Sequence, residues 1–374
     1  MQVDMKKRSP ALDVIRCFAL LCVICVHFFR NTDLYAVTIN GKVLLGMISL
    51  RNFFMICVPL FLMLSGYLLK NKRPGKAYYF KLVQTIGIYL LASVACGVYK
   101  VLFASEPISI GAAVRGLFSF STAGYGWYVE MYLGLFLLIP FLNMMYEGAK
   151  TQKNRKLLVC SLLILTALPS ILNIWKLLPL SWWLRPSSSQ SYDYLVPDYW
   201  IMIFPITYYV IGAYLRDYPL RLKRSVNLLL ILLVFAVGGL FNYYRSYGTF
   251  FVGGEWSDYR SILVVVQSVL VFHFLNGLDY SRVGDKTAAV LGRLSSWTLG
   301  AYLCSEIFDG LFYPLITEHV SGMLMRLLYF PLIVPAVYIC SLALSAILNG
   351  IYALCARLFR RKKICVQTSG PKHG

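Results

Sequence analysis

The feature of this sequence that most constrains its fold is a series of ten long apolar segments. Most have about 17–25 residues, the length that a helix needs to cross the hydrocarbon core of a bilayer. Backbone groups in lipid must be hydrogen-bonded internally, so segments of this kind form helices. The segments cover residues 11–29, 47–69, 78–103, 127–146, 157–175, 200–215, 226–244, 261–278, 297–316 and 328–356. We expect an all-α, polytopic membrane protein with about ten transmembrane helices.

The composition excludes an ordinary soluble domain. Hydrophobic residues make up 59% of the chain and charged residues 14%, and the mean hydropathy is +0.66. We find no low-complexity segment, internal repeat or soluble domain between the apolar segments. We therefore expect one membrane-embedded domain over residues 1–374, with a short basic tail at 357–374.

The positive charges predict the orientation. Of the 36 Lys and Arg residues, 24 lie in alternate connections and at the two ends, eight lie in the opposite connections, and four lie within apolar segments. Cytoplasmic loops carry such an excess, so both termini are expected in the cytoplasm. Nucleic-acid binding, which a net charge of +20 would otherwise suggest, needs a basic face on a folded domain, and none is predicted.

The first apolar segment has two other interpretations, a signal peptide and a zinc site. Arg16 interrupts the apolar run and no small-residue cleavage site follows, so we expect this segment to be retained. Cys22 and Cys25 form a C-x-x-C with His27 nearby. A helix points these side chains in different directions, so we expect apolar filler and no bound metal.

Three ionisable residues of the first segment share one helix face. They belong to a stripe with 3-4-3-4 spacing: Asp13, Arg16, Leu20, Val23 and His27. Arg16 and His27 lie within about 20° of each other and about 16 Å apart along the axis. Ionisable groups in lipid are expensive and usually functional. Two structural alternatives stay open: Arg16 as an interfacial cation paired with Asp13, and His27 as a hydrogen bond between helices.

Three predicted outer connections, at about 104–126, 176–199 and 245–260, are rich in aromatic residues, Ser and Gly. The stretches "WWLRPSSSQSYDYLVPDYW" and "YYRSYGTFFVGGEWSDYR" stand out. Such residues form belts at the membrane interface. They also suit a platform on which sugar rings stack, and the composition leaves both interpretations open.

Five stretches in order resemble the acyltransferase 3 family of membrane acyltransferases. The first, "LDVIRCFALLCVICVHF", resembles the first-helix signature in which ten residues separate Arg from His. The others resemble later helices of the family, and the resemblance covers the whole chain. They are "FFMICVPLFLMLSGYLL" (53–69), "GWYVEMYLGLFLLIPFLN" (126–143), "YYVIGAYLRDY" (208–218) and "LSSWTLGAYL" (294–303).

The resemblance implies an activity. Family members move an acyl group, usually acetyl, from cytosolic acyl-CoA to hydroxyls of surface polysaccharides, lipid-linked glycans or peptidoglycan. By resemblance Arg16 would help to hold the donor and His27 would act in the transfer. We add two donor-binding candidates. Lys81 is predicted on the cytoplasmic side, where CoA phosphates need cations, and Ser65 belongs to the second motif. Acetyl-CoA would be a co-substrate and not a bound cofactor.

The resemblance also implies a setting. We expect a multi-pass protein of a cell membrane, specifically a bacterial cytoplasmic membrane, with the bilayer, acyl-CoA and a polysaccharide or lipid-linked glycan as partners. Glycan-assembly machinery is a further candidate partner. No soluble esterase-like domain is appended, so either the membrane domain completes the reaction or a separate partner does.

Further ionisable residues in the apolar segments are site candidates. Glu130 is predicted at the depth of His27, where it would either orient the imidazole as in a triad or pair with Arg51. The other candidates are Glu306, Asp309 and His273.

One departure from the family is evident. Many members have a His in the ninth helix, whereas here Ser305 follows "AYLC". Ser305 and Glu306 are therefore candidates to replace that His.

Two functions of other classes remain open. Buried charges also serve transporters and flippases, although such folds often contain inverted halves, and residues 190–374 contain no counterpart of the first-segment stripe. A membrane sensor domain without catalysis is the third possibility.

The charge asymmetry makes a topological prediction. Single cysteines introduced into 70–76, 148–156 and 216–224 should react only with reagents that enter the cytoplasm, and those in 30–43 and 245–260 should react from outside. External labelling of a cysteine at position 153 would contradict the ten-helix arrangement.

Overall fold

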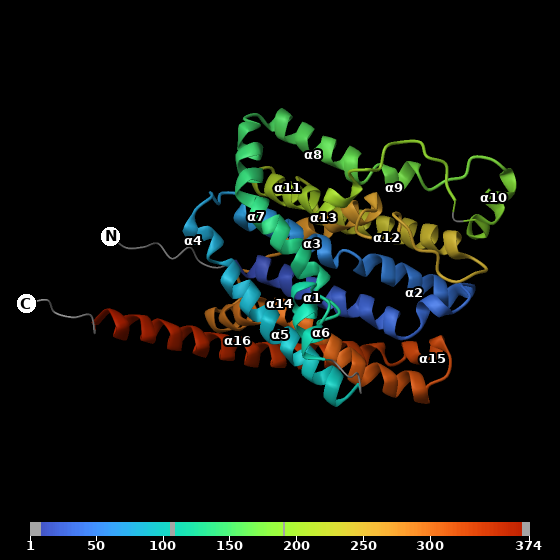
Figure 1. Ribbon diagram of the computed structural model, residues 1–374. Coiled ribbons are helices and arrows are strands. Elements are labelled where there is room, and N and C mark those ends of the chain that lie inside the picture. Colours follow the sequence, from blue (N-terminus) through green and yellow to red (C-terminus); the bar gives the residue numbers. More distant parts are fainter. Residues whose placement is uncertain (1–8, 105–108, 190, 369–374) are drawn as a thin grey trace, which may run out of the picture.

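The computed structural model describes residues 9–104, 109–189 and 191–368, and this part of the chain is helical, with a single isolated β-bridge and no strand. The basic N-terminal residues and the end of the predicted tail lie outside the described residues. The longer helices run side by side as a bundle (Figure 1). Their bounds are α1 Pro10–Asn31, α2 Gly41–Phe54, α3 Cys57–Leu69, α4 Lys76–Tyr79, α5 Leu82–Leu102, α6 Ile110–Phe118, α7 Trp127–Gly148, α8 Gln152–Thr166, α9 Pro169–Leu172, α10 Leu180–Leu184, α11 Phe204–Asp217, α12 Arg224–Ser246, α13 Ile262–Asn276, α14 Asp285–His319, α15 Met323–Leu327 and α16 Phe330–Thr368.

Every predicted apolar segment falls on one helix or on two consecutive ones. Within the described residues, six helical stretches are long and apolar enough to cross a membrane, which indicates a multi-pass, all-α membrane protein: Pro10–Ala36, Gly41–Leu69, Lys76–Leu102, Trp127–Gly148, Arg224–Ser246 and Phe330–Leu358. The remaining four segments coincide with helices that are shorter or carry more charge. Ten crossings and cytoplasmic termini remain predictions.

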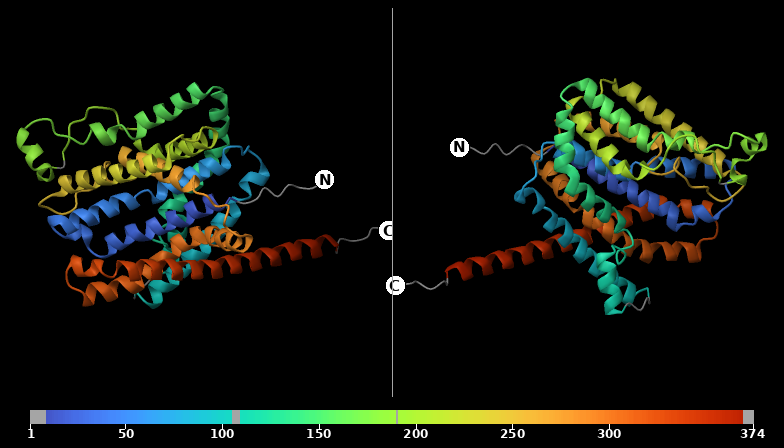
Figure 2. Two further views of the ribbon diagram at one scale, coloured as in Figure 1. Left: turned by 180° about the vertical axis from the view of Figure 1, so that it is seen from behind. Right: turned by 45° about the horizontal axis from the view of Figure 1, so that its top comes forward.

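Three helices differ from the expectation drawn from the sequence. Helix α14 begins at Asp285 and has 35 residues, whereas the apolar run starts at 297. Its first turns contain good helix formers between charged residues, so they continue the helix without being apolar. Helix α6 lies in a stretch predicted as a connection. Helix α16 projects well beyond its neighbours in every view (Figures 1 and 2).

Helix α1 is the central element of the bundle. It packs against α2, α3, α13, α14 and α16, and half of its residues are buried. The polar stripe of α1 therefore faces other helices rather than lipid. This position follows from the cost of exposing Asp13, Arg16 and His27 to hydrocarbon.

Helices α3 and α11 make a close backbone contact that depends on two glycines. A Cβ atom added to Gly66 would lie 1.9 Å from the Tyr209 carbonyl oxygen, and one added to Gly212 would lie 2.0 Å from the Met63 carbonyl oxygen. Small residues allow membrane helices to pack at this distance. The Ser-Gly-Tyr motif thus has a structural role at Gly66.

This contact predicts the effect of one added methyl group. Gly66→Ala should force α3 and α11 apart and lower stability by about 1–3 kcal/mol, measured as a lower melting temperature in nanodiscs. Gly134→Ala in α7 is the control, because a Cβ there would meet nothing within 4 Å. Equal melting temperatures for the two variants would contradict the contact.

Candidate active site

His27 lies beside a carboxylate from a helix far away in the sequence. Its Nδ1 is 3.1 Å from Oδ2 of Asp309, which joins α1 to α14. The Tyr125 hydroxyl donates a hydrogen bond of 2.7 Å to the same oxygen, and the Tyr125 ring centroid lies 4.0 Å from the imidazole. The side chains of His27 and Asp309 are only 11% and 5% exposed. These three residues form the His27 cluster.

The cluster selects one tautomer of the imidazole. An ionised carboxylate only accepts hydrogen bonds, so Nδ1 of His27 carries the proton that points at Asp309. Nε2 is then left with a lone pair, as a general base requires. The carboxylate would also stabilise the imidazolium formed when Nε2 takes up a proton.

Arg16 lies on the same face of α1, seven residues before Val23. Its Nη1 donates a hydrogen bond of 3.0 Å to the Ser295 hydroxyl and lies 3.9 Å from a carboxylate oxygen of Asp13. Asp13 is buried, whereas the Arg16 side chain is 27% exposed. The predicted pair therefore exists, and it leaves part of the guanidinium accessible.

A cavity of about 190 Å³ extends along α1 from Arg16 toward His27. Helices α1, α3, α5, α7 and α14 contribute its walls, which combine apolar side chains with hydroxyl groups. Val23, at its His27 end, precedes His27 by one helical turn. The residues around the cavity are Arg16, Val23, Val58, Phe61, Leu64, Ser65, Thr85, Tyr128, Tyr132, Thr298, Leu299 and Tyr302.

Two tyrosine rings separate the cavity from His27. Tyr302 lines the cavity, and its ring centroid lies 6.0 Å from that of Tyr125, which itself lies against His27. The cavity thus ends one turn short of the imidazole, and aromatic rings occupy the space between. An elongated molecule that entered at Arg16 would reach His27 only past these rings.

Glu306 holds the loop that carries Tyr125. Its carboxylate forms an ion pair of 3.0 Å with Lys100 and accepts a hydrogen bond of 2.5 Å from the Gly124 amide. Lys100 also donates to the Thr122 carbonyl oxygen at 3.0 Å. These contacts attach the residues before α7 to α5 and α14, so they fix the position of the Tyr125 hydroxyl.

The predicted partner of His27 is replaced by another residue. Glu130 lies exposed in the first turn of α7, and among the described residues its carboxylate contacts neither His27 nor Arg51. Ser305 is fully buried and donates to the Tyr302 carbonyl oxygen of its own helix at 2.8 Å. Asp309, a more general candidate in the sequence, occupies the place beside His27 that was proposed for Glu130.

The other predicted residues have separate locations. Ser65 lines the cavity and donates to the Phe61 carbonyl oxygen at 3.0 Å. Lys81 is exposed beside α5 and does not line the cavity.

Two more of the predicted residues lie outside the cavity and the His27 cluster. Arg51 is buried, donates to the Tyr35 hydroxyl at 3.0 Å and to the Ser257 carbonyl oxygen, and so connects two loops. His273 is half-buried in the last turn of α13, which adjoins the start of α12.

Sequence reasoning missed the hydroxyl groups of the site. Tyr125 precedes α7 in "AGYGWYVE", in a connection whose aromatic residues were interpreted as an interfacial belt or a platform for sugar rings. Thr85, Tyr132 and Thr298 lie in apolar segments and look like ordinary helix residues. Only the packing of α1 against its neighbours identifies them as walls of one cavity.

The comparison with known families agrees with these motifs. Residues 9–347 match the family model described as an acyltransferase domain, that of acyltransferase 3. No curated protein and no solved structure matches the chain significantly. Because the match covers nearly the whole chain, including α1 and α14, the chain belongs to the acyltransferase 3 family of membrane acyltransferases.

Proposed function

We propose that the protein transfers an acyl group, most simply acetyl, from cytosolic acyl-CoA to a hydroxyl of a cell-surface or lipid-linked polysaccharide. One observation carries the proposal: His27 has a carboxylate partner and lies one turn from a cavity that has Arg16 at its other end. Membership of the acyltransferase family supports the class of reaction.

The proposed step uses the free Nε2 of His27. Nε2 removes the proton of the acceptor hydroxyl while its oxygen attacks the thioester carbonyl. The carbon–sulfur bond breaks, an oxygen ester forms, and the imidazolium returns the proton to the departing thiolate. Asp309 keeps the ring oriented and stabilises its transient charge.

The donor is proposed to enter from the Arg16 end. A guanidinium recognises phosphate oxygens by paired hydrogen bonds, and the accessible part of Arg16 faces the cavity. Beyond it the walls are mainly apolar with hydroxyls of Ser65, Thr85 and Thr298, which suit an extended chain of amides and methylenes. The excess of positive charge in the predicted cytoplasmic loops supports entry from that side.

The proposal is tested by labelled acetyl transfer. Cells that contain the protein should incorporate label from acetyl-CoA into envelope glycan. Cells with His27→Ala should incorporate label about 10²–10⁴-fold more slowly. Abundance in the membrane and donor binding should stay near those of the parent. Transfer at the parental rate would contradict the role of His27, and coupled solute flux without incorporation would indicate a transporter.

Asp309 should matter more than Glu130. Asp309→Asn keeps the shape but removes the charge that orients and stabilises the imidazole, so kcat should fall about 10²-fold or more with little change in KM. Glu130→Gln is the matched control and should keep near-parental kcat, because its carboxylate is exposed. The reverse order in acyl-transfer kinetics would contradict the His27 cluster.

Replacing Arg16 should mainly weaken binding of the acyl-CoA donor. Arg16→Lys keeps the positive charge but loses the paired geometry, so KM for acyl-CoA should rise about tenfold or more while the protein still folds. The measurement is steady-state transfer over a range of acyl-CoA concentrations. An unchanged KM would make Arg16 a topology anchor only.

A further inference from the structure

A second cavity, of about 280 Å³, lies among the loops at the end of the bundle where α1 and α12 end. It is formed by the segment after α9 and by the turn at 253–256. Backbone hydrogen bonds join the loops that follow α1 and α12. The Ile39 amide donates to the Thr249 carbonyl oxygen at 2.8 Å, and the Gly248 amide donates to the Ile39 carbonyl oxygen at 2.9 Å. The cavity is therefore at the same end of the molecule as His27.

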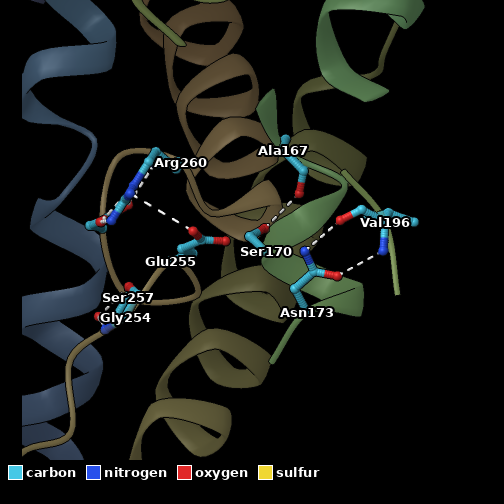
Figure 3. A network of polar contacts seen from close by, with 9 residues as sticks. Ala167, Ser170, Asn173, Val196, Gly254, Glu255, Ser257 and Arg260 are labelled. Carbon is cyan, nitrogen blue, oxygen red and sulfur yellow. Dashed lines mark hydrogen bonds and ion pairs between the residues drawn. The ribbon is translucent and has the colours of Figure 1, made fainter. Parts of the chain in front are cut away.

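The walls of this cavity are held rigidly. The Asn173 amide donates to the Val196 carbonyl oxygen at 2.7 Å and accepts from the backbone amides of Leu195 and Val196 at 3.0 Å (Figure 3). Asp193 accepts from the Leu177 amide at 2.7 Å. Rigid walls avoid the entropic cost of ordering a loop when a ligand binds.

Arg245 supports the aromatic side of the cavity from behind. It is fully buried, and its guanidinium lies 4.2, 4.8 and 4.9 Å from the ring centroids of Trp256, Tyr192 and Trp182. Its Nη1 donates to the Ile174 carbonyl oxygen at 2.7 Å. The cation thus fixes the rings and occupies one face of each.

Three residues that line the cavity carry buried polar atoms without a hydrogen-bond partner in the described part of the chain, and one of these atoms is the Tyr192 hydroxyl. The other two are the indole Nε1 of Trp256, a residue only 3% exposed, and Oε2 of Glu255. Figure 3 shows the Glu255 carboxylate between Arg260 and the segment that contains Ser170 and Asn173. Buried groups are normally paired, so these three atoms point to a missing ligand or water.

The remaining polar groups are carboxylates, and the exposed ring of Tyr194 completes the aromatic lining. Asp193, Asp198 and Glu255 all line the cavity. Aromatic rings contact the apolar face of a sugar, and carboxylates accept hydrogen bonds from pairs of its hydroxyls. A cationic amine would also suit carboxylates, but Arg245 already lies against the rings, so a second cation there would be repelled.

We propose that this cavity binds one neutral sugar unit of the acceptor, which makes it a subsite separate from the His27 cluster. The proposal rests on the proposed function, in which the acceptor is a glycan. Two aromatic residues that lie close in the chain to Trp256 and to Tyr125 stack on each other. Tyr259, three residues after Trp256, stacks on Trp127 with centroids 5.8 Å apart, and Trp127 lies two residues after Tyr125. A glycan held at the cavity would extend along these rings toward His27.

The first test is binding by the full-length protein in nanodiscs. The probes are the methyl glycosides of glucose, galactose and N-acetylglucosamine, with tetramethylammonium as the cationic comparison. Tyr194→Ala and Asp198→Asn should each weaken binding of the preferred glycoside about tenfold. Tyr199→Ala is the matched control, because Tyr199 is 86% exposed and does not line the cavity, and its affinity should equal that of the parent.

Three results would overturn the subsite. They are the absence of saturable binding for all three glycosides, equal weakening by Tyr199→Ala, and displacement of the glycoside by tetramethylammonium.

A second test separates this proposal from the proposed function. With an acceptor glycan, Tyr194→Ala and Asp198→Asn should raise KM for the acceptor about tenfold and leave kcat and KM for acyl-CoA unchanged. Parental KM values would overturn the subsite while acyl transfer stands. Glycoside binding that depends on Tyr194, in a protein that transfers no acyl group, would support the subsite and contradict the acyltransferase proposal.

Discussion

The contact between His27 and Asp309 joins helices α1 and α14 at the centre of the bundle. A buried carboxylate and an imidazole within apolar helices are each costly, and their pairing removes much of that cost. The contact places α1 against α14 at a fixed register, and the Tyr125 hydroxyl adds the loop before α7. Because an ionised Asp309 accepts a hydrogen bond from Nδ1 of His27, the same contact that stabilises the packing also leaves Nε2 as a base.

The arrangement of the rest of the site depends on the positions of Arg16 and His27 along α1. Arg16 and His27 share a helix face, so a cavity that follows this face runs from a fixed cation to within one helical turn of the imidazole. An acyl-CoA molecule has matching parts, with phosphates at one end and a thioester at the other. The rings of Tyr302 and Tyr125 lie between cavity and imidazole, and they keep the two polar ends apart until a molecule passes them.

The sequence predicted the helices and the two ends of the α1 stripe, because apolar length and intramembrane charge are properties of the chain itself. It placed Glu130 beside His27, because the two have similar predicted depths, but depth does not say which helix face points at α1. Asp309 was one candidate among several until the packing of α14 was known. Tyr125 and Thr85 look ordinary in the sequence, and only three-dimensional contacts distinguish them. The Ser-Gly-Tyr motif contains a packing glycine, Gly66, beside the site residue Ser65.

The central claim is that the acyl donor enters at the Arg16 end of the bundle and that His27 deprotonates the acceptor hydroxyl, whose oxygen then takes up the acyl group. The most direct measurement uses proteoliposomes that contain the protein in one orientation, with labelled acetyl-CoA on one side and acceptor glycan on the other. The account predicts labelled glycan only when acetyl-CoA is on the Arg16 side, and almost none with His27→Ala. Equal labelling from either side, or undiminished labelling with His27→Ala, would contradict it.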